Sequence, residues 1–254
     1  MTDSRPKEYT LAHVLTAGET DAAGRMPVTL IVARAIEAAT LHANALNIGY
    51  ADLKPHGLGW VLARISVEMD RFPGINEHYS ITTWIEGVNK YFSDRCYEIR
   101  GADGLIIGRI RSMWVAIDTV RRSMADLSTL GGNFLLSSRG CKLPACRPPR
   151  HKNDAELVKS SYCFRYTDID FNGHVNTLRY IEAVLNQHDT DFYANHRITA
   201  LEASFEHECR YGQTVTLVTD AKPDKDGACT TEIITPEGQR AVAIRLSFNQ
   251  LEQS

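Results

Sequence analysis

Long apolar runs and a strong charge of either sign are both missing from the sequence. No stretch of the 254 residues approaches the roughly 20 apolar residues that a transmembrane helix needs. The first residues, MTDSRPKEYT, are polar and no apolar run follows them, so they do not resemble a signal peptide. The formal net charge of −3 disfavours a general nucleic-acid binder, which carries a basic surplus. We therefore expect a protein that binds neither membranes nor nucleic acids.

Closely paired cysteines are also absent. The 6 cysteines are scattered, and the nearest pair, Cys141 and Cys146, has no histidine cluster to complete a zinc site. The sequence contains no phosphate loop and no dinucleotide fingerprint. We therefore expect no metal and no cofactor, and we expect free thiols in a reduced, cytoplasmic chain.

What the sequence does contain is a globular composition, with 43% hydrophobic residues, and an internal repeat. The first half alternates like a strand over residues 8–16 and has a helical pattern over 27–49, where Pro27 and Gly49 suit a helix start and stop. Four strand-like runs separated by turn sequences follow, at 59–72, 78–88, 91–100 and 105–118.

The second half repeats this order. A strand pattern covers residues 158–167 and a helical pattern covers 175–193. Four more strand-like runs follow, at 198–211, 213–222, 228–235 and 239–250. This order indicates a duplication of about 120 residues per unit. A helix that is apolar over most of its girth must be buried, and an antiparallel sheet curled around it is the natural cover.

The repeat predicts two domains, 1–126 and 154–254, joined by a linker at 127–153. The linker is rich in Gly, Ser and Pro and contains no Asp or Glu. Its basic residues are Arg139, Lys142, Arg147, Arg150 and Lys152. We expect a crossing linker with solvated charges, and a docking surface for an acidic partner is the alternative.

The two strand-to-helix junctions differ in their polar side chains. The first junction reads DAAGR at residues 21–25, and the second reads DFNGH at 170–174. The aspartate and the glycine match, but the second copy has Asn172 and His174 where the first has alanine and arginine. If both segments served only to cap a helix, they should look alike. Any chemistry therefore belongs to the second unit.

A second comparison uses an Arg-aromatic step that both halves share, at residues 71–72 and 210–211. This alignment places Glu208 and Cys209 opposite residues 69–70, so the second unit again holds the more reactive pair. Strand alternation puts these two side chains on opposite faces, with Cys209 on the more apolar one. Both can enter one pocket only where the strand bulges or ends.

These motifs resemble the acyl-acyl carrier protein (acyl-ACP) thioesterases, the plant plastid enzymes and their bacterial relatives. The resemblance covers nearly the whole chain and is carried by LGWVLARISVEMDRFP, ITTWIEG, RIRSMWVAIDTVRRSM, DIDFNGHVNTLRYIE and HECRYGQTV. It implies an α+β tandem double hot-dog fold, each unit a long helix wrapped by an antiparallel sheet. It also implies hydrolysis of fatty acyl-ACP thioesters, which releases free fatty acid and ends fatty acid synthesis. The first unit would bind the acyl chain, and acyl carrier protein would be the partner.

By the same resemblance the catalytic residues are Asp170, Asn172, His174, Glu208 and Cys209. Asp170 would be a general base for water or a direct nucleophile, Asn172 a donor to the oxyanion, and His174 a proton shuttle. Cys209 is the rival nucleophile, in a Cys-His-Asn set. Each residue alone also has a structural explanation, such as a helix cap for Asp170, a turn for Asn172 or a core position for Cys209.

Two other functions are compatible with these residues. Acyl-CoA hydrolysis would use the same groups on a different carrier. A non-catalytic hot-dog module would bind acyl chains or a partner without turnover, but the loss of the amide and the imidazole from the first copy alone favours catalysis. The tandem units could also pair further into a homodimer.

Overall fold

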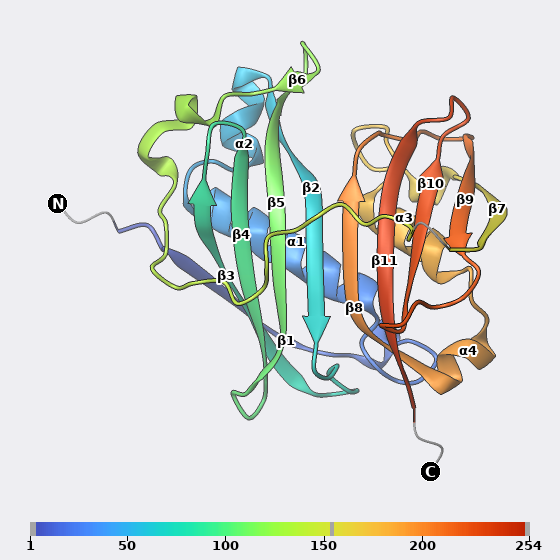
Figure 1. Ribbon diagram of the computed structural model, residues 1–254. Helices are drawn as coiled ribbons and strands as arrows, with labels where there is room; N and C mark the ends of the chain where they lie inside the picture. Colours follow the sequence, from blue (N-terminus) through green and yellow to red (C-terminus); the bar gives the residue numbers. More distant parts are fainter. Residues whose placement is uncertain (1–3, 153–154, 252–254) are drawn as a thin grey trace. The chain divides into compact units, whose positions relative to one another are not determined.

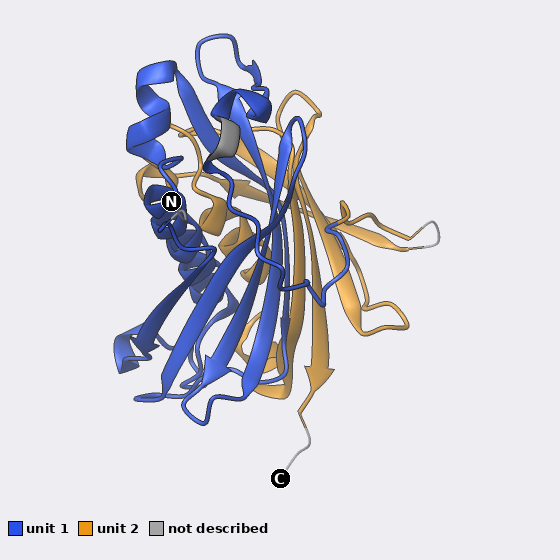
Figure 2. Cartoon of the chain, turned by 90° about the vertical axis from the view of Figure 1, so that its left-hand side faces the viewer, with its two compact units in different colours: residues 1–146 blue, residues 147–254 orange. Residues whose placement is uncertain are grey.

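The chain forms two units in the computed structural model, which describes residues 4–152 and 155–251. Unit 1 is Met1–Cys146 and unit 2 is Arg147–Ser254 (Figure 2). The predicted boundary between residues 153 and 154 lies outside the described residues, so the domain limits stay a prediction. No helix in the described part of the chain is both long enough and apolar enough to cross a membrane.

Unit 1 places one long helix, α1 (Val28–Ala45), against an antiparallel sheet (Figure 1). The helix ends before the predicted Gly49 because Asn47 adopts a left-handed φ of 58°. The N–H of Ile48 then donates to the carbonyl of Ala43 at 3.0 Å, which closes the helix. The strands are β1 (Glu8–Val14), β2 (Leu58–Met69), β3 (His78–Val88), β4 (Phe92–Gly101), β5 (Ile106–Asp118) and β6 (Ser123–Met124). Short helical turns are η1 (Ala17–Glu19), α2 (Tyr50–Leu53), η2 (Lys54–His56) and η3 (Leu127–Asn133).

The strands of unit 1 pair antiparallel in the order β1-β3-β4-β5-β2, and β6 pairs with β5. The buried residues of α1 recur every three or four positions and include Ile31, Val32, Ala35, Ala38 and Ala39. Small alanines let the helix approach the sheet closely. Full burial of one branched side chain such as Ile31 contributes about 1.5–3 kcal/mol.

A polar contact sits inside this otherwise apolar layer. His42 of α1 is fully buried, and its Nδ1 lies 2.7 Å from a guanidinium nitrogen of Arg95 on β4. The other ring nitrogen, Nε2, lies 2.9 Å from the carbonyl oxygen of Pro6. Because the arginine can only donate and the carbonyl can only accept, this geometry fits a neutral imidazole with its hydrogen on Nε2. Burial and then the charge of Arg95 lower the pKa of His42 to about 4.

Unit 2 repeats the plan on a smaller scale. Its strands are β7 (Leu157–Cys163), β8 (His196–Phe205), β9 (Thr214–Asp220), β10 (Ala228–Ile234) and β11 (Arg240–Gln250), and its helical elements are η4 (Tyr166–Asp168), α3 (Thr177–Leu185) and α4 (Thr190–Asn195). The sheet order within the unit is β8-β11-β10-β9-β7. The predicted α+β architecture, a helix covered by an antiparallel sheet in each unit, is confirmed.

Three predicted elements of unit 2 are too long, and the first of them, the strand predicted over 158–167, ends at Cys163. The helix predicted over 175–193 breaks after Leu185, because the Asp189 carboxylate accepts the N–H of Phe192 at 2.8 Å and starts α4 afresh. The strand predicted over 198–211 ends at Phe205. Beyond it, two successive N–H groups, those of residues 206 and 207, donate to the single carbonyl of Ala241, which turns the chain away from its register.

The segment 134–146, which we call the strap, crosses the face of the unit 1 sheet that points away from α1 (Figure 1). Arg139 holds the strap in place through ion pairs with Glu8, at 3.1 Å, and with Glu98. Its guanidinium also lies 4.6 Å from the centre of the Trp84 ring. The predicted linker is therefore a structured part of unit 1 as far as residue 146.

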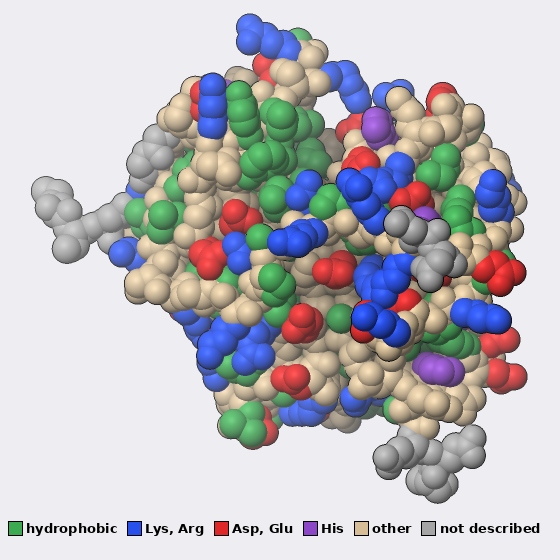
Figure 3. Space-filling view, viewed as in Figure 1, with side chains coloured by type: hydrophobic (Ala, Val, Ile, Leu, Met, Phe, Trp, Pro, Cys, Tyr) green, Lys and Arg blue, Asp and Glu red, His purple; other side chains and the backbone are tan. Residues whose placement is uncertain are grey.

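The basic residues of the predicted linker have different environments. Lys152 is ion-paired with Asp224 at 2.7 Å, so the expectation of merely solvated charge is wrong for Lys152 and for Arg139. Lys142, Arg147 and Arg150 are exposed. On the face shown in Figure 3, Lys and Arg side chains lie among Asp and Glu side chains without one dominant basic patch.

The buried histidine of unit 1 predicts a pH-dependent stability. The folded state holds His42 neutral down to about pH 4, whereas the unfolded chain protonates it near 6.5, so the unfolded state binds more protons between these values. The stabilisation is fully present above pH 6.5 and is lost as the pH falls toward 4, by about 3 kcal/mol in all. Urea unfolding midpoints between pH 7 and pH 4.5 should fall more steeply for the wild type than for His42→Gln. Equal slopes for the two proteins would refute this assignment.

Candidate active site

The site begins with a closed turn between η4 and α3. One carboxylate oxygen of Asp170, Oδ1, accepts the N–H groups of Asn172, at 2.8 Å, and of His174, at 3.3 Å. The Asp170 N–H in turn donates to the carbonyl of His174 at 2.8 Å. Gly173 occupies a left-handed φ of 79°, which a side chain disfavours. The carboxylate thus fixes the backbone that carries the amide and the imidazole.

Unit 1 contains the same turn, as the sequence alignment predicts. Asp21 Oδ1 accepts the N–H groups of Ala23, at 2.9 Å, and of Arg25, at 3.0 Å, and Gly24 has a φ of 70°. Here, however, Arg25 lies back against the second oxygen, Oδ2, of Asp21 at 3.9 Å. Backbone geometry therefore explains the aspartate and the glycine in both copies, and it leaves Asn172 and His174 unexplained.

His174 points toward Glu208 instead. The His174 Nε2 and Glu208 Oε2 atoms are 3.1 Å apart, and the two side chains are 20% and 39% exposed. A carboxylate on one ring nitrogen fixes the orientation of the imidazole. In the described residues 4–152 and 155–251, Oδ2 of Asp170 accepts no hydrogen bond, so it is open to a ligand.

Backbone hydrogen bonds correct the second sequence alignment. The Cys209 carbonyl accepts the N–H of Val175 at 2.8 Å, just as the Pro73 carbonyl accepts that of Met26 at 3.2 Å. The structural counterparts of Glu208 and Cys209 are therefore Phe72 and Pro73, and the predicted match with residues 69–70 is wrong.

The following residues extend the same register. The Arg210 N–H donates to Gln213 Oε1 at 2.7 Å, as the Gly74 N–H donates to Glu77 Oε2 at 3.1 Å. A shared Arg-aromatic dipeptide is too short to fix a register when the chain leaves its strand. In this register the units differ at the position that matters for the imidazole, because unit 1 has a phenylalanine where unit 2 has the glutamate partner of His174.

Cys209 is buried rather than presented to the open side of the site. Its side chain and backbone are 0% exposed, and its N–H donates to the hydroxyl of Tyr180, from α3, at 2.8 Å. Burial raises the pKa of the Cys209 thiol. A buried, protonated thiol is a poor nucleophile. The geometry therefore gives Cys209 a positioning role, through the carbonyl that holds Val175.

The backbone N–H groups that open α3 are largely occupied. Those of Val175 and Asn176 donate to the carbonyls of Cys209 and Asp168, both at 2.8 Å. The N–H of Leu178 donates to the side chain of Asn176, which caps the helix. The side chain of Asn172 is exposed and carries an amide donor.

A pocket of about 440 Å³ lies beside Asp170. Its other lining residues are Tyr166, Thr167, Ile169, Phe171 and Tyr211. The three aromatic residues among them are unusually open, at 83%, 79% and 67% exposed. Exposed aromatic side chains around one carboxylate form a surface suited to an amphipathic ligand. Sequence reasoning missed these residues, because single aromatics in turns carry no periodic signal.

Comparison with known protein families gives two successive matches along the chain. The acyl-ACP thioesterase N-terminal domain matches residues 6–129, and the acyl-ACP thioesterase C-terminal domain matches residues 151–250. Among named relatives, a chloroplastic oleoyl-acyl carrier protein thioesterase of Coriandrum sativum is 26% identical over 76% of this chain and 55% of its own length. A chloroplastic acyl-acyl carrier protein hydrolase of Cuphea viscosissima is 24% identical over 72% of this chain and 46% of its own. The chain thus spans about half the length of the curated relatives it matches.

Solved structures match over the full chain. An acyl-ACP thioesterase from Bacteroides thetaiotaomicron is 27% identical, with a TM-score of 0.84 over 96% of this chain and 98% of its own. A 12:0-ACP thioesterase from Umbellularia californica, at 17% identity, shares the fold with a TM-score of 0.83 over 97% of this chain and 98% of its own.

The burial of Cys209 predicts its reactivity. Iodoacetamide applied to the native protein should leave Cys209 unmodified, because its thiol is buried and protonated, while the half-buried Cys163 of the same unit is alkylated. Peptide mapping by mass spectrometry would measure both sites, and the urea-unfolded protein is the control in which both react. Rapid alkylation of native Cys209 would restore it as a candidate nucleophile.

Proposed function

The chain belongs to the acyl-ACP thioesterase family, and from this premise we propose that it hydrolyses fatty acyl-ACP thioesters. Water is consumed, the C–S bond breaks, and a free fatty acid and the carrier thiol are released, which ends chain elongation. The observation that carries the proposal is the contrast between two equivalent turns. Only the second bears an amide, an imidazole with a carboxylate partner and an open aspartate oxygen.

Asp170 is the centre of the proposed reaction. Its Oδ1 is held by two N–H groups, so its Oδ2 can be aimed at a thioester carbonyl or at a water molecule. Attack by Oδ2 on the carbonyl would expel the carrier thiolate and leave an acyl anhydride on Asp170, which water then hydrolyses to the free fatty acid. Removal of a proton from water would instead make Asp170 a general base. Both routes need the same fixed carboxylate beside the open pocket.

His174 and Glu208 form the proposed proton-transfer pair. Glu208 orients the imidazole through the 3.1 Å contact, and His174 can pass to the departing thiolate the proton that the attacking water gives up. Asn172 is the proposed donor to the oxyanion that forms on the carbonyl. The occupied N–H groups of Val175 and Asn176 support this choice, because they are already committed to carbonyl acceptors.

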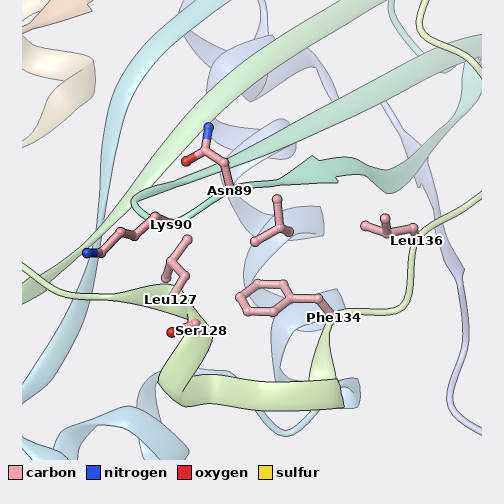
Figure 4. Close-up of a pocket in the computed structure, with 7 residues that line it drawn as sticks. Asn89, Lys90, Leu127, Ser128, Phe134 and Leu136 are labelled. Carbon is pink, nitrogen blue, oxygen red and sulfur yellow. The ribbon is translucent and has the colours of Figure 1, made fainter.

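Unit 1 supplies a second pocket, which supports the proposal that this unit binds the acyl chain. The pocket has a volume of about 280 Å³. Its lining includes Leu127, Phe134 and Leu136, with Asn89 and Lys90 beside them (Figure 4). Phe134 also packs on the buried cluster formed by Ala43, Leu46, Ile48 and Ile85. An apolar opening over an apolar core suits a hydrocarbon tail.

The carrier and the compartment are part of the proposal. An acidic carrier protein would be drawn to exposed cations, and Lys142, Arg147 and Arg150 are exposed. A cytoplasmic location is supported by the cysteines, all 6 of which are free thiols. The predicted homodimer stays a prediction.

A substrate panel would test the reaction and the carrier together. Purified protein offered acyl-ACP and acyl-CoA thioesters of stepped chain length should release thiol from acyl-ACP with the higher kcat/KM. Asp170→Asn should lower kcat by roughly 10²–10⁴-fold, because it removes the reactive carboxylate but keeps a side-chain acceptor for the turn. Asp21→Asn makes the same change in the equivalent turn of unit 1 and should keep wild-type turnover. Acyl binding without thiol release from either carrier would contradict the hydrolase proposal.

The proposed oxyanion role of Asn172 predicts a specific change in the kinetic constants. Asn172→Ala should lower kcat by roughly 10²–10³-fold with little change in KM, because the lost donor acts mainly in the transition state. Circular dichroism and urea unfolding should be unchanged, since the turn is held by the backbone N–H of this residue and not by its amide. A variant that raises KM while keeping kcat would place Asn172 in substrate binding instead.

A further inference from the structure

We propose that Cys96 and Cys141 are a peroxide-sensitive thiol pair, and that their disulfide fastens the strap to the sheet of unit 1. This modification site is independent of the proposed hydrolysis and lies on different elements from the candidate active site. Cys96 belongs to β4 and is fully buried, while Cys141 belongs to the strap and is half-buried. Their sulfur atoms lie within 4.8 Å of each other, and both lie within that distance of a Glu86 carboxylate oxygen.

The strap is held so that Cys141 stays above Cys96. The Cys141 N–H donates to Glu86 Oε1 at 2.9 Å, and Arg111 pairs with Glu86 Oε2 at 2.6 Å. Arg111 also donates to the carbonyl of Leu143 at 3.0 Å. These contacts fix the strap at Cys141 and at Leu143, two residues further along.

The two thiols differ in their electrostatics. A hydrogen bond from Cys96 and the nearby Arg111 guanidinium lower the pKa of Cys141, although burial opposes them. The same contact with Cys141, followed by burial, raises the pKa of Cys96. Cys141 is therefore suited to react with an oxidant as a thiolate. Cys96 stays protonated and is suited to attack the oxidised sulfur of Cys141 afterwards.

The chemistry balances with a peroxide as the oxidant. The Cys141 thiolate attacks one peroxide oxygen, the O–O bond breaks, and hydroxide leaves with a sulfenic acid formed on Cys141. The Cys96 sulfur then attacks the Cys141 sulfur, the S–O bond breaks, and the thiol proton leaves with the oxygen as water. Two thiols are oxidised and one peroxide is reduced. A disulfide needs about 2.05 Å between sulfurs, so the side chains and strap must close the remaining gap.

A metal ion is the competing use of the same three side chains, and their surroundings disfavour it. Both oxygens of Glu86 are already engaged, one by the Cys141 N–H and one by Arg111. The Arg111 guanidinium places a fixed positive charge beside the position where a cation would bind. A three-ligand set would also need a fourth ligand to complete a tetrahedral zinc site.

Tryptic mapping of the full chain gives a sharp test. The reduced protein is treated with hydrogen peroxide, unreacted thiols are blocked with iodoacetamide, and the protein is digested without reductant. Trypsin should cut after Arg95, Arg100, Arg139 and Lys142. We expect peptide 96–100 linked to peptide 140–142, lighter by two hydrogens than their sum and separable by reductant. Cys96→Ser and Cys141→Ser should abolish this species, and Cys163→Ser, which removes another half-buried thiol, should leave it unchanged.

Three outcomes would overturn the proposal. A link between peptide 140–142 and peptide 143–150 would show that Cys146 resolves the oxidation within the strap. Sulfinic acid on Cys141 without any cross-link would show that Cys96 cannot reach it. Stoichiometric zinc in the purified protein, lost in Cys96→Ser and in Cys141→Ser, would assign the cluster to a metal. Folding of each variant is checked by circular dichroism, and Cys141→Ala serves as a second substitution if Cys141→Ser does not fold.

Discussion

A carboxylate that accepts two backbone N–H groups is the constraint on which the site depends. Asp170 closes the turn, so the direction of the Asn172 and His174 side chains follows from its Oδ1 contacts. Asp21 closes an equivalent turn in unit 1. Because the turn is shared, the side chains that differ between the copies are not needed to form it. The duplication thus distinguishes the residues that build the turn from those proposed to act in the reaction.

The second constraint is the point at which β8 stops pairing. Once two successive N–H groups share the Ala241 carbonyl, the chain leaves the sheet after Phe205 and strict alternation no longer applies. Glu208 can then reach His174 while Cys209, its neighbour, turns into the core. The two neighbouring side chains therefore lie in different environments: the Glu208 carboxylate is half-exposed and the Cys209 thiol is buried.

Sequence patterns were sufficient for the repeat and most of the elements, and for the correspondence of residues 21–25 with 170–174, because periodicity and turn residues are local signals. The sequence patterns gave wrong predictions where hydrogen bonds to backbone atoms far along the chain determine the local structure. The end of β8 depends on the carbonyl of Ala241, and the register of Glu208 depends on the hydrogen bond between Cys209 and Val175. The composition of the strap predicted a free linker. Its ordered structure instead comes from ion pairs and hydrogen bonds with distant strands.

One position accounts for the main difference between the two equivalent turns. In unit 1 the residue four places after the aspartate is Arg25, whose side chain folds back to 3.9 Å from Asp21 Oδ2. In unit 2 the same place holds His174, which turns to Glu208 and leaves Oδ2 of Asp170 open beside the pocket. An arginine there would pair with the carboxylate and could not exchange a proton near neutral pH. In the proposed reaction the imidazole supplies the proton-transfer group, and its orientation toward Glu208 leaves the aspartate available.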